Sequence, residues 1–257
     1  MAVTVEPVRL RIDSPPARAV GTAVDILSAW MPVEHLRLGG GTALEARWHH
    51  RASTDLDFSF TPATAPSNSL FLKDFDGIRS DLLRLARDGV IASDSVVMVG
   101  THHIQFMVGE VPVSFVGTEM FHGDPRDEAE YETGVILGSS RDILTKKMYN
   151  RLGVNRLATE RDAYDFAVAR TLAPDDLLYA WSTLTDDMKQ DTLAAYRDLA
   201  EGDNRGLSQA LVKPKFERIA RQVWQQVLRM MESDLEYVPP LTQRDGDGCH
   251  SGGGHGR

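Results

Sequence analysis

The sequence has little cysteine, no long apolar run and no excess of positive charge. Its one cysteine, Cys249, excludes a disulfide within the chain and agrees with a reducing compartment. No segment approaches the roughly 20 apolar residues of a membrane span, and the first residues lack the pattern of a signal peptide. We therefore expect a cytoplasmic protein without membrane attachment. The net charge of −9 excludes a globally basic nucleic-acid-binding surface, so RNA would have to bind a local patch.

The most informative stretch is LGGGTALEARWHHRASTDLDFSF, residues 38–60. A predicted strand over 35–38 runs into three glycines, and Thr42 is placed to cap a short helix that ends at Arg47. A polar turn then leads to a second predicted strand, over 56–60. Glycines in such a turn let backbone N–H groups approach a phosphate, and the start of the following helix favours anions.

The second strand begins with two carboxylates, Asp55 and Asp57. Side chains two residues apart on a strand point to the same face. The pair therefore predicts a site for Mg²⁺, which needs only one or two carboxylates besides phosphate and water. Taken alone, an Asp-x-Asp pair is more often a solvated strand face, and the glycine run lacks the Gly-Lys-Ser/Thr of a P-loop. The glycine turn and helix followed by the carboxylate strand form a more specific signal than the glycine turn or the Asp-x-Asp pair alone.

A second charged pattern lies further along the chain. A capping-box pattern predicts a helix over about 139–152, in which Lys147 and Arg151 share a face. The next helix carries Asp162 and Asp165 on one face. These charges could form a surface salt-bridge lattice, which is the common role of charged helix faces. Against that, residues 141–170 hold seven Lys/Arg and four Asp/Glu, a local charge of +3 that could steer a phosphate-rich substrate.

Three motifs together resemble the DNA polymerase β nucleotidyltransferase superfamily: GGTAL…HRxSxDLDF, DILxxKM and RDxYDF. The form of the first is similar to that of the AbiEii/AbiGii toxin family, which includes the MenT-type toxins. The resemblance covers about residues 35–170. It implies transfer of a nucleoside monophosphate from an NTP to an RNA acceptor, typically a tRNA 3′ end, with release of pyrophosphate. It also implies Mg²⁺ as cofactor and a cognate antitoxin as partner.

The resemblance also implies a set of site residues. The catalytic residues would be Asp55 and Asp57, which also hold the metal, together with Lys147 and Asp162. Lys147 would engage a nucleotide phosphate, with Lys146 as the alternative in another register, and Asp162 would activate the acceptor hydroxyl or order the lysine. The nucleotide-binding residues would be Gly40, Gly41, Thr42, Arg51, Ser53, Arg151 and Asp165.

One feature expected from the resemblance is missing. Polymerase β-type enzymes generally place a third carboxylate on a later strand, and here the matching position is Ser114. Glu110 or Glu119 could replace it only in another register. Without a third carboxylate a second metal ion is held less firmly. Two alternatives therefore stay open: a nucleotide-binding regulator that has lost transfer activity, or an enzyme that modifies a protein or a small molecule.

The remaining patterns predict an α+β fold. The resemblance implies a polymerase β-like nucleotidyltransferase domain, with a mixed sheet flanked by helices, over residues 1–138. A helical domain would cover 139–240, and a disordered tail 241–257. Beyond the motifs, strands are predicted over 95–99, 102–108, 111–116 and 134–137, and helices over 15–31, 71–88, 174–183, 186–201 and 212–234.

Overall fold

The computed structural model describes residues 14–61, 65, 67, 71, 74–93, 95–98, 103–118, 129–131, 133–201 and 211–233. The predictions for Glu119 and for a disordered tail over 241–257 lie outside these residues. None of the helices in this part of the chain combines the length and the apolar character needed to cross a bilayer.

Among the described residues, a mixed sheet of seven strands forms one part of the molecule, with the order β3-β4-β5-β2-β1-β7-β6. At its centre β2 pairs in parallel with β5 and antiparallel with β1, which in turn pairs in parallel with β7. The strands are β1 (Arg37–Leu38), β2 (Leu56–Phe60), β3 (Val97–Met98), β4 (His103–Val108), β5 (Val111–Gly117), β6 (Ala129–Glu130) and β7 (Ile136–Leu137).

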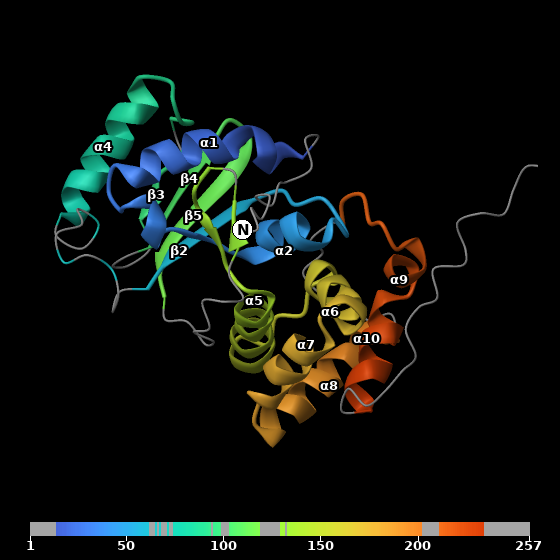
Figure 1. Ribbon diagram of the computed structural model, residues 1–257. Helices are drawn as coiled ribbons and strands as arrows, with labels where there is room; N and C mark the ends of the chain where they lie inside the picture. Colours follow the sequence, from blue (N-terminus) through green and yellow to red (C-terminus); the bar gives the residue numbers. More distant parts are fainter. Residues whose placement is uncertain are drawn as a thin grey trace, which may run out of the picture.

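Helices cover this sheet and fix the position of its central strands. Helix α1 (Pro15–Ser28) packs on β4 and β5, and α2 (Gly40–Trp48) packs on β2 (Figure 1). Helix α4 (Phe75–Arg87) lies at the outer end of this part of the molecule. The burial of β2 alternates, so Leu56 and Phe58 enter the core, whereas Asp57 is half-buried on the other face. Strand pleating thus aims Asp57 away from the core.

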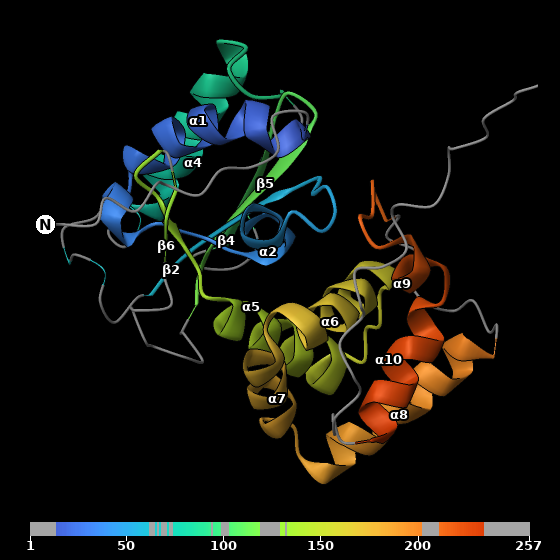
Figure 2. The same cartoon turned by 45° about the vertical axis from the view of Figure 1, so that its right-hand side comes forward.

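The second part of the molecule is helical. It begins with α5 (Ser140–Lys146), continues as a π-helical segment, η3 (Lys147–Val154), and then turns into α6 (Glu160–Leu172). Figure 2 shows these elements gathered with the later helices on one side of the sheet. The later helices are α7 (Pro174–Ser182), α8 (Asp186–Ala200), α9 (Glu217–Arg221) and α10 (Val223–Glu232). The predicted α+β fold class is confirmed, and the division into domains at residue 138 stays a prediction.

Several predicted elements differ from the observed ones. The helix predicted over 71–88 begins at Phe75, because the Asp74 side chain accepts a hydrogen bond from the Gly77 N–H and caps it. The helix predicted over 212–234 is two helices, since the backbone at Gln222 leaves helical geometry with φ −132° and ψ 30°. The strands predicted over 95–99 and 134–137 are shorter than expected.

Candidate active site

The glycine turn between β1 and α2 is shaped by the side chains that pack against it. Gly40 has φ +59°, and a Cβ there would lie 2.1 Å from Oδ2 of Asp57. A Cβ on Gly41 would lie 2.4 Å from a guanidinium nitrogen of Arg51. The Gly39 N–H donates to the Asp57 carbonyl oxygen at 2.7 Å. The absence of side chains at the glycines therefore lets the carboxylate strand and Arg51 approach the start of α2.

Thr42 does not cap α2, so that prediction was wrong. The helix already begins at Gly40, and no side chain caps its start. The buried Thr42 hydroxyl instead donates towards the carbonyl oxygen of Asp55 and lies 2.8 Å from the Ser53 hydroxyl. Ser53 in turn donates from its hydroxyl to Oδ1 of Asp55 at 3.2 Å, and from its N–H to Glu45 at 2.7 Å. These bonds fix the polar turn that leads into β2.

Asp57 on β2 faces Ser114 on the neighbouring strand β5, the position that the resemblance matches to a third carboxylate. The two residues are register partners in the parallel pairing of β2 with β5, and the Ser114 hydroxyl donates to Oδ1 of Asp57 at 2.8 Å. The pKa of Asp57 is raised from its ordinary value, first by burial and then by the negative charge of Asp55. Within the described residues, no three His, Cys, Asp or Glu side chains gather closely enough to hold a metal ion.

The carboxylate pair nevertheless fits a divalent cation. Asp55 stands just before β2 and is partly exposed, and the pKa of Asp57 is raised because burial and the negative charge of Asp55 outweigh the nearby positive charges of Arg151 and Lys147. Hard cations such as Mg²⁺ take carboxylate oxygens and complete their shell with water and substrate phosphates. Two carboxylates at the mouth of a glycine turn are the donor set that such an arrangement requires.

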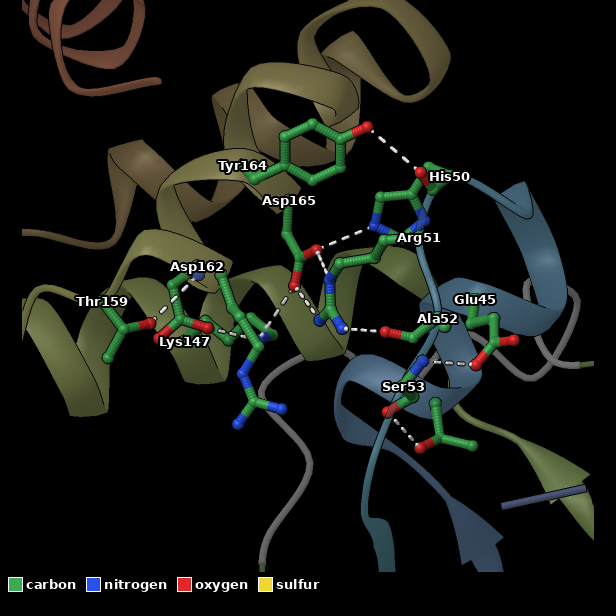
Figure 3. A network of polar contacts seen from close by, with 12 residues as sticks. Glu45, His50, Arg51, Ala52, Ser53, Lys147, Thr159, Asp162, Tyr164 and Asp165 are labelled. Carbon is green, nitrogen blue, oxygen red and sulfur yellow. Dashed lines mark hydrogen bonds and ion pairs between the residues drawn. The ribbon is translucent and has the colours of Figure 1, made fainter. Parts of the chain in front are cut away.

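Beside this pair lies a buried ionic network centred on Asp165 of α6 (Figure 3). The Arg51 guanidinium donates to both carboxylate oxygens, at 2.7 and 2.9 Å, and Lys147 lies 3.1 Å from the second. His50 approaches the first oxygen at 2.8 Å. Burial alone would raise the pKa of Asp165, but the charges of Arg51 and Lys147 hold it well below its ordinary value. Asp165 is therefore ionised and bonded on all sides.

His50 enters this network as a neutral ring. Burial lowers its pKa and outweighs the opposing effect of Asp165. Its Nε2 therefore donates to the carboxylate, and its Nδ1 is buried without a hydrogen-bond partner in the described part of the chain. The ring stacks on Tyr164 with centroids 5.7 Å apart.

A second node of the network is Asp162, one turn earlier on α6. It accepts from Lys147 and from Arg151, the latter at 2.9 Å. The positive charges of these two residues outweigh burial and lower the pKa of Asp162. Lys146 points elsewhere and pairs with Asp142 at 2.8 Å. The geometry thus places Lys147, and not its neighbour, next to Asp162.

The structure brings all the sequence-predicted site residues into one region. The glycine turn, Thr42, Ser53 and the carboxylate pair form one half, and the Asp162–Asp165 network forms the other. Two arginines join the halves: Arg51 lies against Gly41, and Arg161 of α6 lies 3.6 Å from Oδ1 of Asp55.

Sequence reasoning missed three members of this region. Arg161 also donates to the Thr54 hydroxyl at 2.9 Å. From the sequence it was counted only among the seven positive charges of residues 141–170, although its position next to Asp162 in the RDxYDF motif could have marked it as a site residue. His50 and Glu45 gave no signal. A histidine beside another histidine, and a glutamate within a short helix, look like surface residues until tertiary contacts bury them.

Comparisons with known proteins relate the chain to nucleotidyltransferases. A family model described as "Nucleotidyl transferase AbiEii toxin, Type IV TA system" matches residues 32–243. No curated protein sequence matches the chain. Among solved structures, JHP933 from Helicobacter pylori is 14% identical with a TM-score of 0.45, over 85% of this chain and 92% of that one.

Two further solved structures match the chain with lower TM-scores and lower sequence identity. The Megavirus polyadenylate synthase is 12% identical with a TM-score of 0.28, over 88% of this chain and 44% of that one. The CdnE cyclic dinucleotide synthase of Elizabethkingia meningoseptica, solved with GTP and Apcpp, is 13% identical with a TM-score of 0.30, over 90% of this chain and 96% of that one.

Proposed function

The chain belongs to the AbiEii nucleotidyl transferase toxin family, and from this premise we propose that it transfers a nucleoside monophosphate from an NTP to an RNA acceptor, releasing pyrophosphate. The acceptor we propose is a tRNA 3′ end, and the protein partner a cognate antitoxin. The observation that carries the proposal is the meeting of the Asp55–Asp57 pair with the Lys147, Arg151 and Asp162 cluster at one glycine turn.

In this proposal Asp55 and Asp57 would hold Mg²⁺, which when bound would supply positive charge against the negative charge of the NTP phosphates. The raised pKa of Asp57 bears on the pH dependence. A protonated carboxyl is a poor cation ligand. Binding of Mg²⁺ to the metal-free protein should therefore weaken on acidification at a higher pH than an ordinary aspartate would allow.

The side chains of Lys147 and Arg151 differ in their exposure to solvent, which supports a different role for each. The Arg151 side chain is 38% exposed, so its guanidinium can exchange Asp162 for a triphosphate oxygen. Lys147 is 7% exposed and fixed between Asp162 and Asp165. We assign it a preorganised positive charge behind the phosphates, which needs little reorganisation during the reaction. Arg161, beside Asp55, is a third candidate for contact with phosphate.

For Asp162, we propose the ordering of Lys147 and Arg151 and not proton abstraction. The carboxylate is buried, its pKa is lowered, and both cations bond to it. A carboxylate that holds its charge so strongly is a weak general base. Arg51 and Asp165 are likewise buried against each other, which supports a role in fixing the Gly40–Gly41 turn and the Ser53 hydroxyl for nucleotide contact.

A second candidate function rests on Ser114. Its place opposite Asp57, where a third carboxylate would stand, favours a nucleotide-binding regulator without transfer activity. A transferase that modifies a protein or a small molecule would use the same site residues.

The test is an assay of the purified protein with labelled NTPs, Mg²⁺ and total tRNA. We expect label in RNA and pyrophosphate in solution, and loss of both in Asp55→Ala and Asp57→Ala. Each substitution removes one charge from a like-charged pair, so we expect both variants to fold. Label in a protein band would favour the other acceptor class, and nucleotide binding without transfer the regulator. Full turnover in the double variant would overturn the proposed function.

A further inference from the structure

The last helices expose one continuous polar face. Helix α10 packs against α6 and α8, and Figures 1 and 2 place it with α9 far from α4. The inner face buries Ile219, Val223, Val227 and Met230. The outer surface exposes Arg218 and Arg221 on α9, Gln225 and Arg229 on α10, and Gln222 at the break between the two helices.

This surface is basic although the chain is acidic. Residues 211–229 contain five Lys or Arg and one Glu, a local charge of +4 in a chain of −9. All five cations are exposed. The acidic residue, Glu217, pairs with Arg221 at 2.8 Å, but both side chains are about three-quarters exposed. Such an exposed pair contributes little to stability, so Arg221 can leave it for an anion.

A groove lies within the same surface. It has a volume of about 540 Å³ and is lined by Arg221, Gln222, Gln225, Leu228 and Arg229. Guanidinium groups bind phosphate oxygens with two parallel hydrogen bonds. The glutamine amides offer both donors and acceptors, which base edges and ribose hydroxyls can use. The lining thus suits a polynucleotide better than a simple anion.

The basic surface is tied directly to the candidate active site. Val212 forms a bridge with Ala52, accepting from its N–H at 2.9 Å, and Ala52 stands three residues before Asp55. The Lys215 N–H donates to the His50 carbonyl oxygen at 2.7 Å. A chain bound along residues 213–229 would therefore end beside the turn that leads into the carboxylate strand.

Resting on the proposed function, we propose that the surface formed by Lys213, Lys215, Arg218, Arg221 and Arg229 binds the phosphate backbone of the RNA acceptor and leads its 3′ end to Asp55 and Asp57. Phosphate contacts position a polynucleotide without reading its sequence. This surface would thus supply affinity, and the active site would select the terminal nucleotide.

The test compares two triple variants with matched charge changes. One carries Arg218→Gln, Arg221→Gln and Arg229→Gln. The control carries Arg79→Gln, Arg84→Gln and Arg87→Gln on the exposed face of α4, at the far end of the molecule. The affinity of each for fluorescein-labelled tRNA is measured by anisotropy over a series of salt concentrations, and the melting temperature and NTP affinity are measured alongside.

We expect the α9–α10 variant to bind the tRNA about tenfold more weakly or worse, and its slope of log Kd against log salt to fall by about 2–3, since each lost phosphate contact contributes 0.7–0.9. NTP affinity and melting temperature should stay unchanged, and the α4 control should bind like the unmodified protein. Equal weakening in both variants would mean a bulk charge effect and would overturn the proposal.

The outcome separates this proposal from the proposed function. If the unmodified protein labels RNA and the α9–α10 variant binds tRNA normally, only the surface assignment falls. If the unmodified protein labels no RNA, the proposed acceptor falls, and the anisotropy series still decides whether the surface binds a polyanion. If the variant keeps its RNA affinity but loses a protein partner, the surface is a protein interface and the proposal is overturned.

Discussion

Asp165 is the residue on which the buried network depends. Its two oxygens bond to Arg51, His50 and Lys147, and every one of these side chains is nearly or fully buried. Removing one member of such a buried set leaves the others charged in a low-dielectric environment. The arrangement therefore constrains the chain more strongly than a surface salt-bridge lattice would.

We predict that Asp165→Asn lowers the free energy of unfolding by about 3–5 kcal/mol at neutral pH, because Arg51 and Lys147 would lose a charged partner. The pKa of Asp165 is depressed in the folded state. Its stabilisation is therefore present above the ordinary pKa of 3.8 and is lost as pH falls through the folded value. Urea denaturation from neutral to acid pH should show the difference between variant and unmodified protein shrinking with acidification.

The control is Asp191→Asn, which breaks the exposed pair with Arg156. Because this pair is solvated, the change should alter stability by less than about 1 kcal/mol at any pH. An Asp165→Asn variant that behaved like this control would contradict the network described above.

At the residue scale, the sequence predicted features that depend on neighbouring residues, and it did not predict contacts between residues far apart in the chain. The shared face of the Asp-x-Asp pair follows from strand periodicity, whereas Ser114 was singled out by the resemblance alone, and the observed register places it opposite Asp57. The partners of Asp165 could not be predicted, because Arg51 and His50 meet it across 114 and 115 residues of chain. Only the folded arrangement of α2, its following turn and α6 creates those contacts.

The element that places the site cations is the π-helical segment η3. Lys147 and Arg151 both reach Asp162 from it, although Lys147 is buried and Arg151 partly exposed. π-Helical turns are rare and are frequently found at functional sites. Here the segment follows α5 directly, and its geometry directs two cations to one carboxylate.

We predict that Lys147→Met lowers both turnover and stability, whereas Lys146→Met leaves turnover unchanged and lowers stability less. Lys147 bonds to two buried carboxylates, so its loss should cost about 3 kcal/mol of stability and reduce turnover at least a hundredfold if it neutralises phosphate charge. Lys146 pairs with Asp142, whose side chain is only 8% exposed, so the loss of Lys146 should also cost some stability, but less than the loss of Lys147, which bonds to two buried carboxylates. Turnover is measured at a temperature at which circular dichroism shows both variants folded.

The sequence alone allowed an exposed salt-bridge lattice around Lys147, and removal of Lys147 from such a lattice would barely change stability. The structure corrects this, because Lys147 and its partners Asp162 and Asp165 are buried. If Lys147→Met, once folded, turns over NTP normally, the buried lysine is structural only. If Lys146→Met is the inactive variant, the register inferred from the motif is wrong by one residue.

At the element scale, helix existence was predictable and helix detail was not. Apolar periodicity and caps predicted α1, α7 and α8 to within a few residues, and Ser139 caps α5 as expected. The π-helical geometry of η3 and the break at Gln222 have no local sequence signal. They follow from packing against neighbouring helices, which overrides intrinsic propensity.

At the scale of the whole molecule, three distant segments meet at the Tyr164 hydroxyl. It donates to the His50 carbonyl oxygen at 3.1 Å and accepts from the Phe216 N–H at 3.0 Å. One group thus connects α6, the turn before β2 and the segment that leads into α9. The helical part of the chain is therefore bonded directly to the turn that leads into the candidate active site.

We predict that Tyr164→Phe lowers the free energy of unfolding by about 1–2 kcal/mol, because it leaves the Phe216 N–H without its acceptor while the aromatic stacking on His50 is kept. Urea denaturation measures this loss. If the helical part positions the turn, NTP affinity should also fall, which titration of a fluorescent NTP analogue would report.

The matched control is Tyr196→Phe in α8. The Tyr196 hydroxyl is buried and has no hydrogen-bond partner in the described part of the chain. Removing an unsatisfied buried hydroxyl should leave stability unchanged or raise it, and NTP affinity should not change. The two variants delete the same atom from the same residue type, so a difference between them isolates the hydrogen bonds at Tyr164. Equal stability and equal NTP affinity in both would show that the three segments hold together without this hydroxyl.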